Sequence, residues 1–340
     1  MNSRTIQIKN NSYEDPFTQG YALQGLIDKG SEGIVYSILH KKSGQLLACK
    51  KIEVGESRIN NLRVLQEIRL LKYLNHENII HLEEYLFAQI ECINTVFLVY
   101  ELFPRNLSES IKSGRITAST QMKYIVSQLA SALYYLHINN FIHRDVKPSN
   151  ILINDRFKIK LCDFGSCKCL NQKESYPTIQ TVCTKIYMPP EYFYEGVEEN
   201  TTIDIWQLGC VYTQMILRTP PFKGHSVSSI KKSILSLIKP EEIIKINNNE
   251  EVNESYGLKE TKTILPYFFR TLKIDSSSQE LIYDMLQIDP LKRITAIEIL
   301  QHQSIAMFKQ PLGEKESHEF EFVKGNETYD EIVQLIKNEM

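Results

Sequence analysis

The stretch that decides the fold lies near the middle of the chain and reads His143-Arg144-Asp145-Val146-Lys147-Pro148-Ser149-Asn150. A carboxylate such as Asp145 can accept the proton of an attacking hydroxyl group. Lys147, two residues on, can neutralise charge that develops on a phosphoryl group during transfer, and Asn150 can hold a divalent cation. Because these functions stand together in one eight-residue pattern, the stretch predicts a site for phosphoryl transfer.

A second motif, Asp163-Phe164-Gly165, follows shortly after the first and is reached through the predicted strand 159–162. A carboxylate at the end of a strand suits a magnesium ion, and the following glycine provides a hinge. Three residues alone would be a weak signal. Their place just after the first motif makes them a strong one.

Two further motifs precede these in the chain. Gly30-Ser31-Glu32-Gly33-Ile34-Val35 lies between two predicted strands, where glycines let the backbone approach phosphates closely. Lys50 follows on the next strand, and Glu67 on the next helix could hold it in place. Glycine-containing hairpins and surface charges are common, so these motifs gain weight only from their order.

Composition excludes several classes of protein. The chain has 340 residues, with 39 Lys and Arg against 41 Asp and Glu, which argues against coating of nucleic acid. No apolar run reaches the ~20 residues of a membrane-spanning helix. The N-terminal residues 1–20 lack the apolar core of a secretory signal. Seven scattered cysteines are typical of reduced thiols in a cytosolic or nuclear protein.

Periodicity predicts strands and one helix, at about 58–75, before residue 101, and mainly helices afterwards. Later helices are expected over about 201–217, 277–287 and 294–302. A stretch rich in Asn, Glu and Lys predicts an exposed insert at about 239–262. Near the C-terminus, Ile332, Leu335 and Ile336 would share one face of a short helix, which could dock or remain a frayed tail.

The four motifs, in this order, resemble those of eukaryotic protein kinases over residues 21–308. Three later segments extend the resemblance: Met188-Pro189-Pro190-Glu191, Asp204-Ile205-Trp206-Gln207-Leu208-Gly209 and Asp289-Pro290-Leu291-Lys292-Arg293. It implies an α+β, two-lobed fold with a β-rich N-lobe (21–103) and a mainly helical C-lobe (104–308). A polar leader (1–20) and a tail (309–340) would flank this domain.

The resemblance also implies ATP and Mg²⁺ as cofactors. It places the nucleotide site at Gly30, Ser31, Gly33, Val35, Ala48, Lys50, Glu101 and Phe103. Lys50 would bind the α- and β-phosphates and pair with Glu67, while Asn150 and Asp163 would hold Mg²⁺.

For catalysis, the resemblance gives Asp145 the role of orienting and deprotonating the substrate hydroxyl, and Lys147 that of contacting the γ-phosphate. Lys147 and Thr184 match the pattern of kinases that act on Ser and Thr. Glu191 would form a structural ion pair with Arg293.

Departures from the family pattern bear on the subfamily. Asp28 replaces the first glycine of the phosphate loop, and Met188 replaces an Arg that is tied to a preference for Pro after the phosphorylated residue. Helix 65–71, the insert and the closing segment resemble the cyclin-dependent and MAP kinase branch, which we favour. The catalytic loop resembles MAP kinase kinases, which leaves a dual-specificity kinase as the alternative. A scaffold without activity is disfavoured, because every catalytic group is present.

Regulation and partners are also implied by the resemblance. Arg144 directly precedes Asp145, as in kinases that are switched on by phosphorylation of the activation loop, where Thr178 and Thr181 are the candidate sites. The expected partners are protein substrates, with room for a regulatory subunit or an upstream kinase. Direct binding of nucleic acid or membrane is not expected, and residence is expected in the cytoplasm, the nucleus or both.

Overall fold

The computed structural model describes residues 16–30, 33–55, 57–90, 92–171, 183–193, 198–235, 274–317, 320 and 328–339. The chain divides into two compact units. The first unit comprises Met1–Asn61, Leu82–Leu102 and Tyr329–Met340, and the second comprises Leu62–His81 and Phe103–Thr328. Four predicted features lie outside the described residues: Ser31, Thr178, Thr181 and the insert at 239–262.

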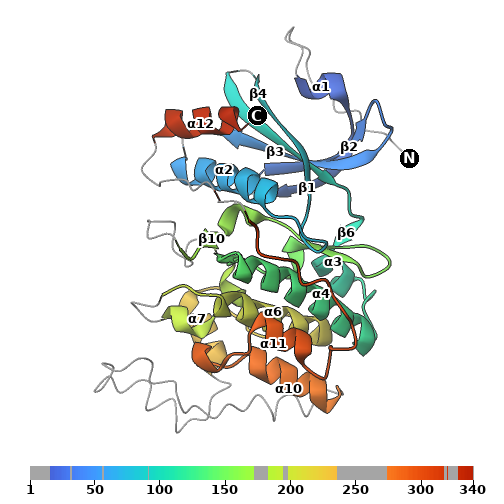
Figure 1. The fold of residues 1–340 in the computed structure, drawn as a ribbon, viewed down its shortest axis with the longest axis vertical. Coiled ribbons are helices and arrows are strands. Elements are labelled where there is room, and N and C mark those ends of the chain that lie inside the picture. Colours follow the sequence, from blue (N-terminus) through green and yellow to red (C-terminus); the bar gives the residue numbers. More distant parts are fainter. Residues whose placement is uncertain are drawn as a thin grey trace. The chain divides into compact units, whose positions relative to one another are not determined.

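A five-stranded antiparallel sheet forms most of the first unit (Figure 1). Its strands, in the order β1-β2-β3-β5-β4, are β1 (Tyr21–Gly30), β2 (Gly33–His40), β3 (Leu46–Val54), β4 (Leu82–Ile90) and β5 (Ile93–Glu101). The predicted hairpin is confirmed, since β2 pairs with β3 across a turn that contains Gly44. Gly44 has φ of 70°, a left-handed conformation that glycine adopts without steric cost.

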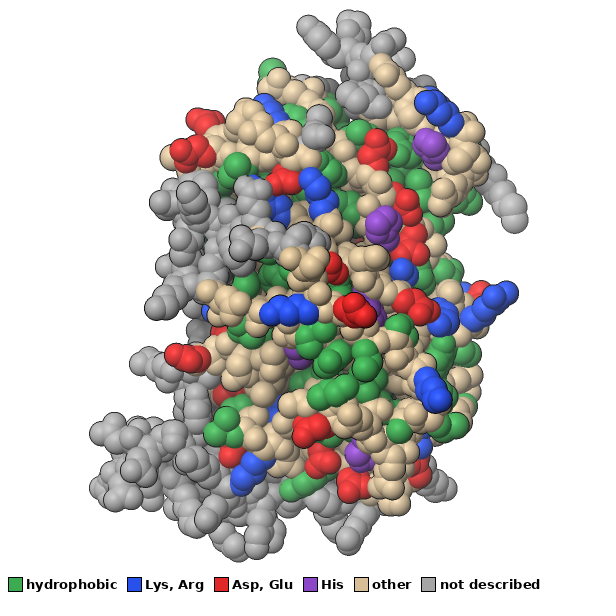
Figure 2. All heavy atoms as spheres, in the orientation of Figure 1, with side chains coloured by type: hydrophobic (Ala, Val, Ile, Leu, Met, Phe, Trp, Pro, Cys, Tyr) green, Lys and Arg blue, Asp and Glu red, His purple; other side chains and the backbone are tan. Residues whose placement is uncertain are grey.

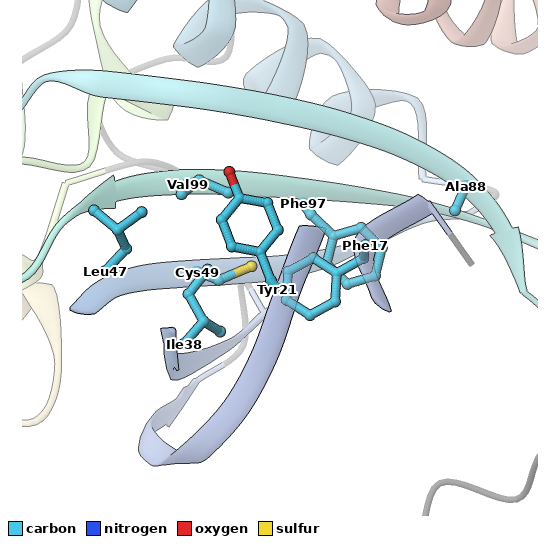
Figure 3. Packing of buried hydrophobic residues seen from close by; sticks show 8 residues of the cluster. All are labelled: Phe17, Tyr21, Ile38, Leu47, Cys49, Ala88, Phe97 and Val99. Atoms are coloured by element: carbon cyan, nitrogen blue, oxygen red, sulfur yellow. The ribbon is translucent and has the colours of Figure 1, made fainter. Parts of the chain in front are cut away.

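An apolar cluster stabilises this sheet (Figure 3). It consists of Phe17, Tyr21, Ile38, Leu47, Cys49, Ala88, Phe97 and Val99. The short helix α1 (Pro16–Gly20) contributes Phe17, whose ring stacks on that of Phe97 with 4.6 Å between centroids. The Tyr21 hydroxyl donates a hydrogen bond to the carboxylate of Glu84 on β4. The last part of the predicted polar leader therefore forms a helix that packs on the sheet.

The C-terminal helix α12 (Tyr329–Asn338) belongs to the first unit. Its residues Ile332, Val333 and Ile336 are buried, and the Lys337 ammonium lies 4.8 Å from the centre of the Phe87 ring on β4. The predicted C-terminal helix is thus confirmed. Its apolar face is covered within this chain, so it is not a free docking surface.

Helices dominate the second unit. They are α2 (Arg58–Tyr73, which begins in the first unit), α3 (Leu107–Lys112), α4 (Ser119–Ile138), α6 (Thr202–Leu217), α7 (Val227–Leu235), α10 (Ser276–Met285) and α11 (Ala296–Gln301). The helices predicted at 58–75, 201–217, 277–287 and 294–302 are confirmed by α2, α6, α10 and α11. The α+β fold class, with a β-rich part and a mainly helical part, is confirmed as well.

Helix α6 is the centre of the second unit. It packs on α4 and α10, and nearly all of its side chains are buried. Gly209 permits the close packing beside α10, because a Cβ atom there would lie 2.8 Å from Cδ2 of Leu286. The Trp206 ring stacks on Phe222 with 5.4 Å between centroids. These apolar contacts hold the helix whose polar side chains position the candidate site.

Short strands and turns carry the predicted site residues. The strands are β6 (Arg105–Asn106), β7 (Phe141–Ile142), β8 (Ile151–Ile153), β9 (Ile159–Leu161) and β10 (Lys168–Cys169). The 3-10 turns are η1 (Pro148–Asn150), η2 (Phe164–Ser166), η3 (Lys185–Tyr187), η4 (Pro190–Phe193) and η6 (Pro290–Lys292). Strand β8 lies between β6 and β9, and β7 pairs with β10.

Acidic and basic side chains are interspersed over the face of the molecule in Figure 2, in keeping with the formal charge of −2. Among the described residues, none of the helices combines the length and apolar character that crossing a membrane requires.

Candidate active site

Helix α6 holds the backbone of the loop that follows β7. The carboxylate of Asp204 accepts hydrogen bonds from the backbone N–H groups of His143, at 2.9 Å, and Arg144, at 2.8 Å. One helical turn on, the Gln207 amide accepts from the N–H of Val146 and donates to the carbonyl of Arg144, each at 2.8 Å. Two buried side chains of one helix therefore fix the loop on which Asp145 and Lys147 stand.

Asp204 is fully buried, and its charge is retained by its partners. Burial by itself raises the pKa of a carboxyl group. The hydrogen bond from His137 Nε2, at 2.9 Å, and the charge of His137 oppose this effect and bring the pKa of Asp204 below its ordinary value. The backbone N–H of His143 acts in the same direction. Asp204 is therefore an anion that anchors the loop.

Asp145, Lys147 and Thr184 meet in a closed set of hydrogen bonds. Lys147 Nζ lies 2.6 Å from Asp145 Oδ2 and 2.8 Å from Thr184 Oγ1. Thr184 donates to Asp145 Oδ1 from both its hydroxyl, at 2.9 Å, and its backbone N–H, at 3.0 Å. The structure thus joins residues 39 positions apart in the sequence around one carboxylate. Charge-assisted bonds of this kind fix the orientation of the carboxylate.

Asn150 also forms a hydrogen bond with the Asp145 carboxylate. Its Nδ2 atom donates to the backbone carbonyl of Asp145, at 3.0 Å, and to Asp145 Oδ2, at 3.1 Å. These bonds do not use the amide oxygen, which is the atom that a magnesium ion would bind. Asn150 also accepts, at its backbone carbonyl, the N–H of Cys162 at 2.9 Å. This bond brings the residue before Asp163 against Asn150.

The Asp163 backbone has φ of 69°, in the left-handed region, which is uncommon for a residue other than glycine. Phe164 is fully buried, and its ring meets His143 edge-on with 5.1 Å between centroids. His143 Nε2 lies 3.1 Å from the carbonyl oxygen of Cys162. Contacts on both sides of Asp163 hold its backbone in this uncommon conformation, and positions of this kind are frequent at functional sites. A carboxylate and an amide oxygen are hard ligands, so Asn150 and Asp163 fit Mg²⁺.

The predicted nucleotide-binding residues lie mainly in the first unit. Gly30 and Gly33 pair at the end of the β1–β2 ladder, Val35 on β2 is the register partner of Lys50 on β3, and Ala48 is that of Tyr100. Gly33 has φ of 142°, and a Cβ atom there would lie 2.5 Å from the Lys51 carbonyl oxygen, so only glycine fits.

Three other predicted site residues are divided between the two units. Glu101 ends β5 in the first unit, while Phe103 and Glu67 belong to the second. The pairing of Lys50 with Glu67 would join the two units and stays a prediction. Asp28, where the family has glycine, lies opposite Val35, and its carboxylate accepts the N–H of Lys29 at 2.8 Å.

Glu191 and Arg293 form a bidentate ion pair at 2.8 and 3.0 Å, and their side chains are 2% and 0% exposed. Arg293 also donates to the carbonyls of Thr202 and Gln287. The guanidinium carbon lies 5.2 Å from the centre of the Trp206 ring. This cluster ties η4 and η6 to α6.

Sequence reasoning missed the positioning roles of Asp204 and Gln207. In the sequence, both appear only within the segment 204–209, which is one of those that carry the family resemblance. The signal available was the presence of strongly polar side chains in a helix that is mainly apolar on every face, because such residues must find buried partners.

Comparisons with known proteins agree with this geometry. Residues 21–305 match the protein kinase domain family, and the chain belongs to it. It is a protein serine/threonine kinase, an enzyme family that in general uses ATP and Mg²⁺. The expectation of a fold and enzyme of this class is confirmed.

Similar proteins include three mitogen-activated protein kinases. Mitogen-activated protein kinase 2 of Arabidopsis thaliana is 34% identical over 84% of this chain and 77% of its own length. A mitogen-activated protein kinase of Fusarium vanettenii is 30% identical over 95% of this chain and 94% of its own length. Mitogen-activated protein kinase KSS1 of Saccharomyces cerevisiae is 33% identical over 87% of this chain and 85% of its own length. These relatives favour the cyclin-dependent and MAP kinase branch over the kinase-kinase and scaffold alternatives.

Proposed function

We propose that this kinase transfers the γ-phosphoryl group of MgATP to Ser and Thr hydroxyls of protein substrates in signalling of the mitogen-activated type. The observation that carries the proposal is the closed set of hydrogen bonds among Asp145, Lys147 and Thr184. In this set a carboxylate, an ammonium group and a hydroxyl lie within hydrogen-bonding distance of one another, and the loop that carries Asp145 and Lys147 is anchored by α6. The relatives' names support the signalling context.

Asp145 would accept the proton of the substrate hydroxyl as the oxygen forms its bond to the γ-phosphorus and the bond to the β-phosphate oxygen breaks. Lys147 would stay beside the moving phosphoryl group and offset its charge. The Thr184 hydroxyl would keep the side chains of Asp145 and Lys147 oriented, because it bonds both of them.

Asn150 and Asp163 would hold Mg²⁺, which supplies charge neutralisation on the phosphates. Lys50, supported by Glu67, would bind the α- and β-phosphates. The remaining nucleotide contacts would come from Gly30, Ser31, Gly33, Val35, Ala48, Glu101 and Phe103.

The acceptor specificity is proposed to be broader than Ser or Thr followed by Pro. Met188 is 1% exposed and lies in an apolar cluster with Ile142, Cys183, Tyr192 and Ile203. An apolar side chain in this cluster cannot supply the polar contacts that the family's Arg makes. This kinase would therefore phosphorylate Ser and Thr without a strict requirement for Pro at the next position.

We also propose that an upstream kinase phosphorylates Thr178 or Thr181, and that the protein resides in the cytoplasm or the nucleus. These parts rest on the resemblance and on the relatives.

The test is transfer of labelled phosphate from MgATP to an arrayed Ser, Thr and Tyr peptide library, with the Asp163→Asn variant as the blank. We expect transfer to Ser and Thr peptides that depends on Asp163 and shows no strict preference for Pro at the next position. Transfer to Tyr peptides at a similar rate would contradict the acceptor class. Transfer by the Asp163→Asn variant at the wild-type rate would contradict the assigned site.

A further inference from the structure

The residue after Thr184 is a lysine whose backbone is held on both sides. The Thr184 hydroxyl donates to the Asp145 carboxylate at 2.9 Å. Tyr187, two residues beyond Lys185, is buried, and its hydroxyl donates to a side chain of α6 at 2.6 Å. The N–H of Met188, which is also buried, donates to the carbonyl of Lys185 at 3.1 Å. The backbone at Lys185 is therefore fixed beside the candidate base.

The side chain of Lys185 lies at the surface, in contrast to the buried residues that follow it. Lys185 is exposed, and within the part of the chain that the structure describes it makes no ion pair. Its Cα atom is about 3.8 Å from that of Thr184, the spacing of adjacent residues. A lysine side chain is a mobile cation on a flexible four-carbon stem. Its charge can therefore reach the residues that flank a Ser or Thr placed at Asp145.

Helix α7 adds positive charge near the same turn. It packs against η3, on which Lys185 lies, and against η4. Lys232 on α7 is exposed, as is Lys223 in the loop before the helix. The bias extends along the sequence, because residues 205–240 contain no Asp or Glu and five Lys or Arg. The segment that includes α7 is therefore uniformly basic.

The acidic side chains of the elements around η3 do not cancel this charge. Glu191 on η4 is buried and paired with Arg293. Asp204 on α6 is buried and bonded to the loop before the candidate base. At the site itself, the charges of Asp145 and Lys147 offset each other at 2.6 Å. The unbalanced charge that η3 and α7 present to solvent is thus positive.

An exposed cation at a fixed place favours an anion on the segment that binds next to it. A single exposed charge pair contributes little, so its effect is a preference and not an absolute requirement. Each residue of an extended substrate spans roughly 3.3–3.6 Å, so one lysine beside the base reaches only the nearest few residues. Charges farther off, such as those of α7, act more weakly because salt screens them over ~10 Å.

We propose that Lys185, supported by the positive charge of α7, selects substrates that carry an Asp or Glu within three residues of the phosphorylated Ser or Thr. The partner of this surface is thus an acidic segment of a protein substrate. The inference rests on the proposed function and deepens it, since it names the sequence context that is favoured where Pro is not required.

A set of matched peptides tests the proposal with the full-length chain and MgATP. In a Ser peptide with otherwise neutral flanks, Asp, Asn and Lys are placed in turn at each of the three positions on either side of the Ser. Asp and Asn differ in charge and hardly in size. The value of kcat/KM is measured for wild type, Lys185→Met, Lys185→Glu and Lys232→Met. Lys309→Met, which removes an exposed cation after α11, is the matched control.

Wild type should prefer Asp to Asn by about threefold or more in kcat/KM at one or more of these positions. Lys185→Met should bring this ratio close to one, and Lys185→Glu should reverse it, so that the Lys peptide is preferred to the Asp peptide. Lys232→Met should lower the ratio by less, and Lys309→Met should leave it unchanged. The wild-type ratio should also shrink in about 0.5 M NaCl, because salt screens exposed charges.

Each ratio compares peptides on one enzyme, so a general loss of activity in a variant does not alter it. A wild-type ratio near one at every position would overturn the proposal, as would a ratio that both Lys185 variants leave unchanged. Unfolding temperatures check folding, and either Lys185 variant alone decides the role of this charge.

The failure of the proposed function would be seen separately. If wild type transfers phosphate to no peptide, the proposed function fails, and binding of the same peptides with Ala in place of Ser then tests the surface. Fluorescence anisotropy measures their affinities. Tighter binding of the Asp than of the Asn peptide by wild type, lost in Lys185→Met, would support the assignment. Equal binding of the two peptides by wild type would contradict it.

Discussion

Thr184 joins its segment of the chain to the loop that carries Asp145 and Lys147. Its hydroxyl bonds both Asp145 Oδ1 and Lys147 Nζ, whereas its N–H makes a third bond that any residue could make. The hydroxyl is therefore the part that a substitution can isolate.

Replacing Thr184 by Ala should lower kcat by about tenfold, because Asp145 and Lys147 each lose a bond that orients them. Thr184→Ser keeps the hydroxyl and serves as the control, which should retain most of the activity. Steady-state kinetics with MgATP and a Ser peptide measure both. Equal activity of Thr184→Ala and Thr184→Ser would show that the hydroxyl is not needed.

The ion pair between Glu191 and Arg293 acts at the scale of elements, because it joins η4 to η6. Breaking a buried pair leaves one charge without compensation, so Glu191→Gln should lower the free energy of unfolding by about 3 kcal/mol. Urea unfolding followed by fluorescence measures this change. The exposed pair of Arg105 with Asp155 provides the control, and Asp155→Asn should leave the unfolding midpoint almost unchanged. Similar midpoints for the two variants would refute the structural role.

His76 connects α4 to the segment after α11 and should make stability depend on pH. Its Nδ1 atom accepts the N–H of Asn78 at 3.0 Å, so the folded protein needs the neutral ring. Burial lowers the pKa of His76 below its ordinary value of 6.5, and the charge of Lys160 lowers it further, whereas the Pro311 carbonyl and Glu77 have smaller opposing effects. The unfolded chain therefore takes up a proton at higher pH than the folded chain does, and this contribution to stability is lost as the pH falls through 6.5.

Unfolding free energies at pH 7.5 and pH 5.5 (about one pH unit on either side of an ordinary His pKa) test this expectation. Wild type should lose stability between them, and His76→Gln should lose less. His225→Gln, at an exposed position, should follow wild type. The expectation is wrong if His76→Gln keeps the full wild-type dependence on pH.

At the scale of the whole molecule, the C-terminal helix α12 completes the first unit from the far end of the chain. Ile332 is fully buried, so Ile332→Ala should lower the free energy of unfolding by about 3 kcal/mol. Gln334→Ala, on the exposed face of the same helix, should be nearly neutral. Thermal unfolding compares the two. If Ile332→Ala is also neutral, α12 does not stabilise the first unit.

How much the sequence could predict depended on the range of each interaction. Asp145, Lys147 and Asn150 stand within one short motif, so their common role could be predicted from spacing, as could the main strands and helices from periodicity. The contacts of Asp204 with His143 and Arg144 could not, because they join segments that are distant in sequence. Likewise, the burial of Phe17 and Ile332 in the first unit depends on bringing residues near both ends of the chain together with the sheet.

The central claim is that Asp145 is the base of a phosphoryl transfer to Ser or Thr. Its most direct test is the rate of γ-phosphoryl transfer from MgATP to the best Ser peptide, compared between wild type and Asp145→Asn. We expect a fall in kcat of about 10²- to 10⁴-fold, with MgATP binding and unfolding temperature retained. A kcat within a few-fold of wild type in a folded Asp145→Asn variant would contradict it.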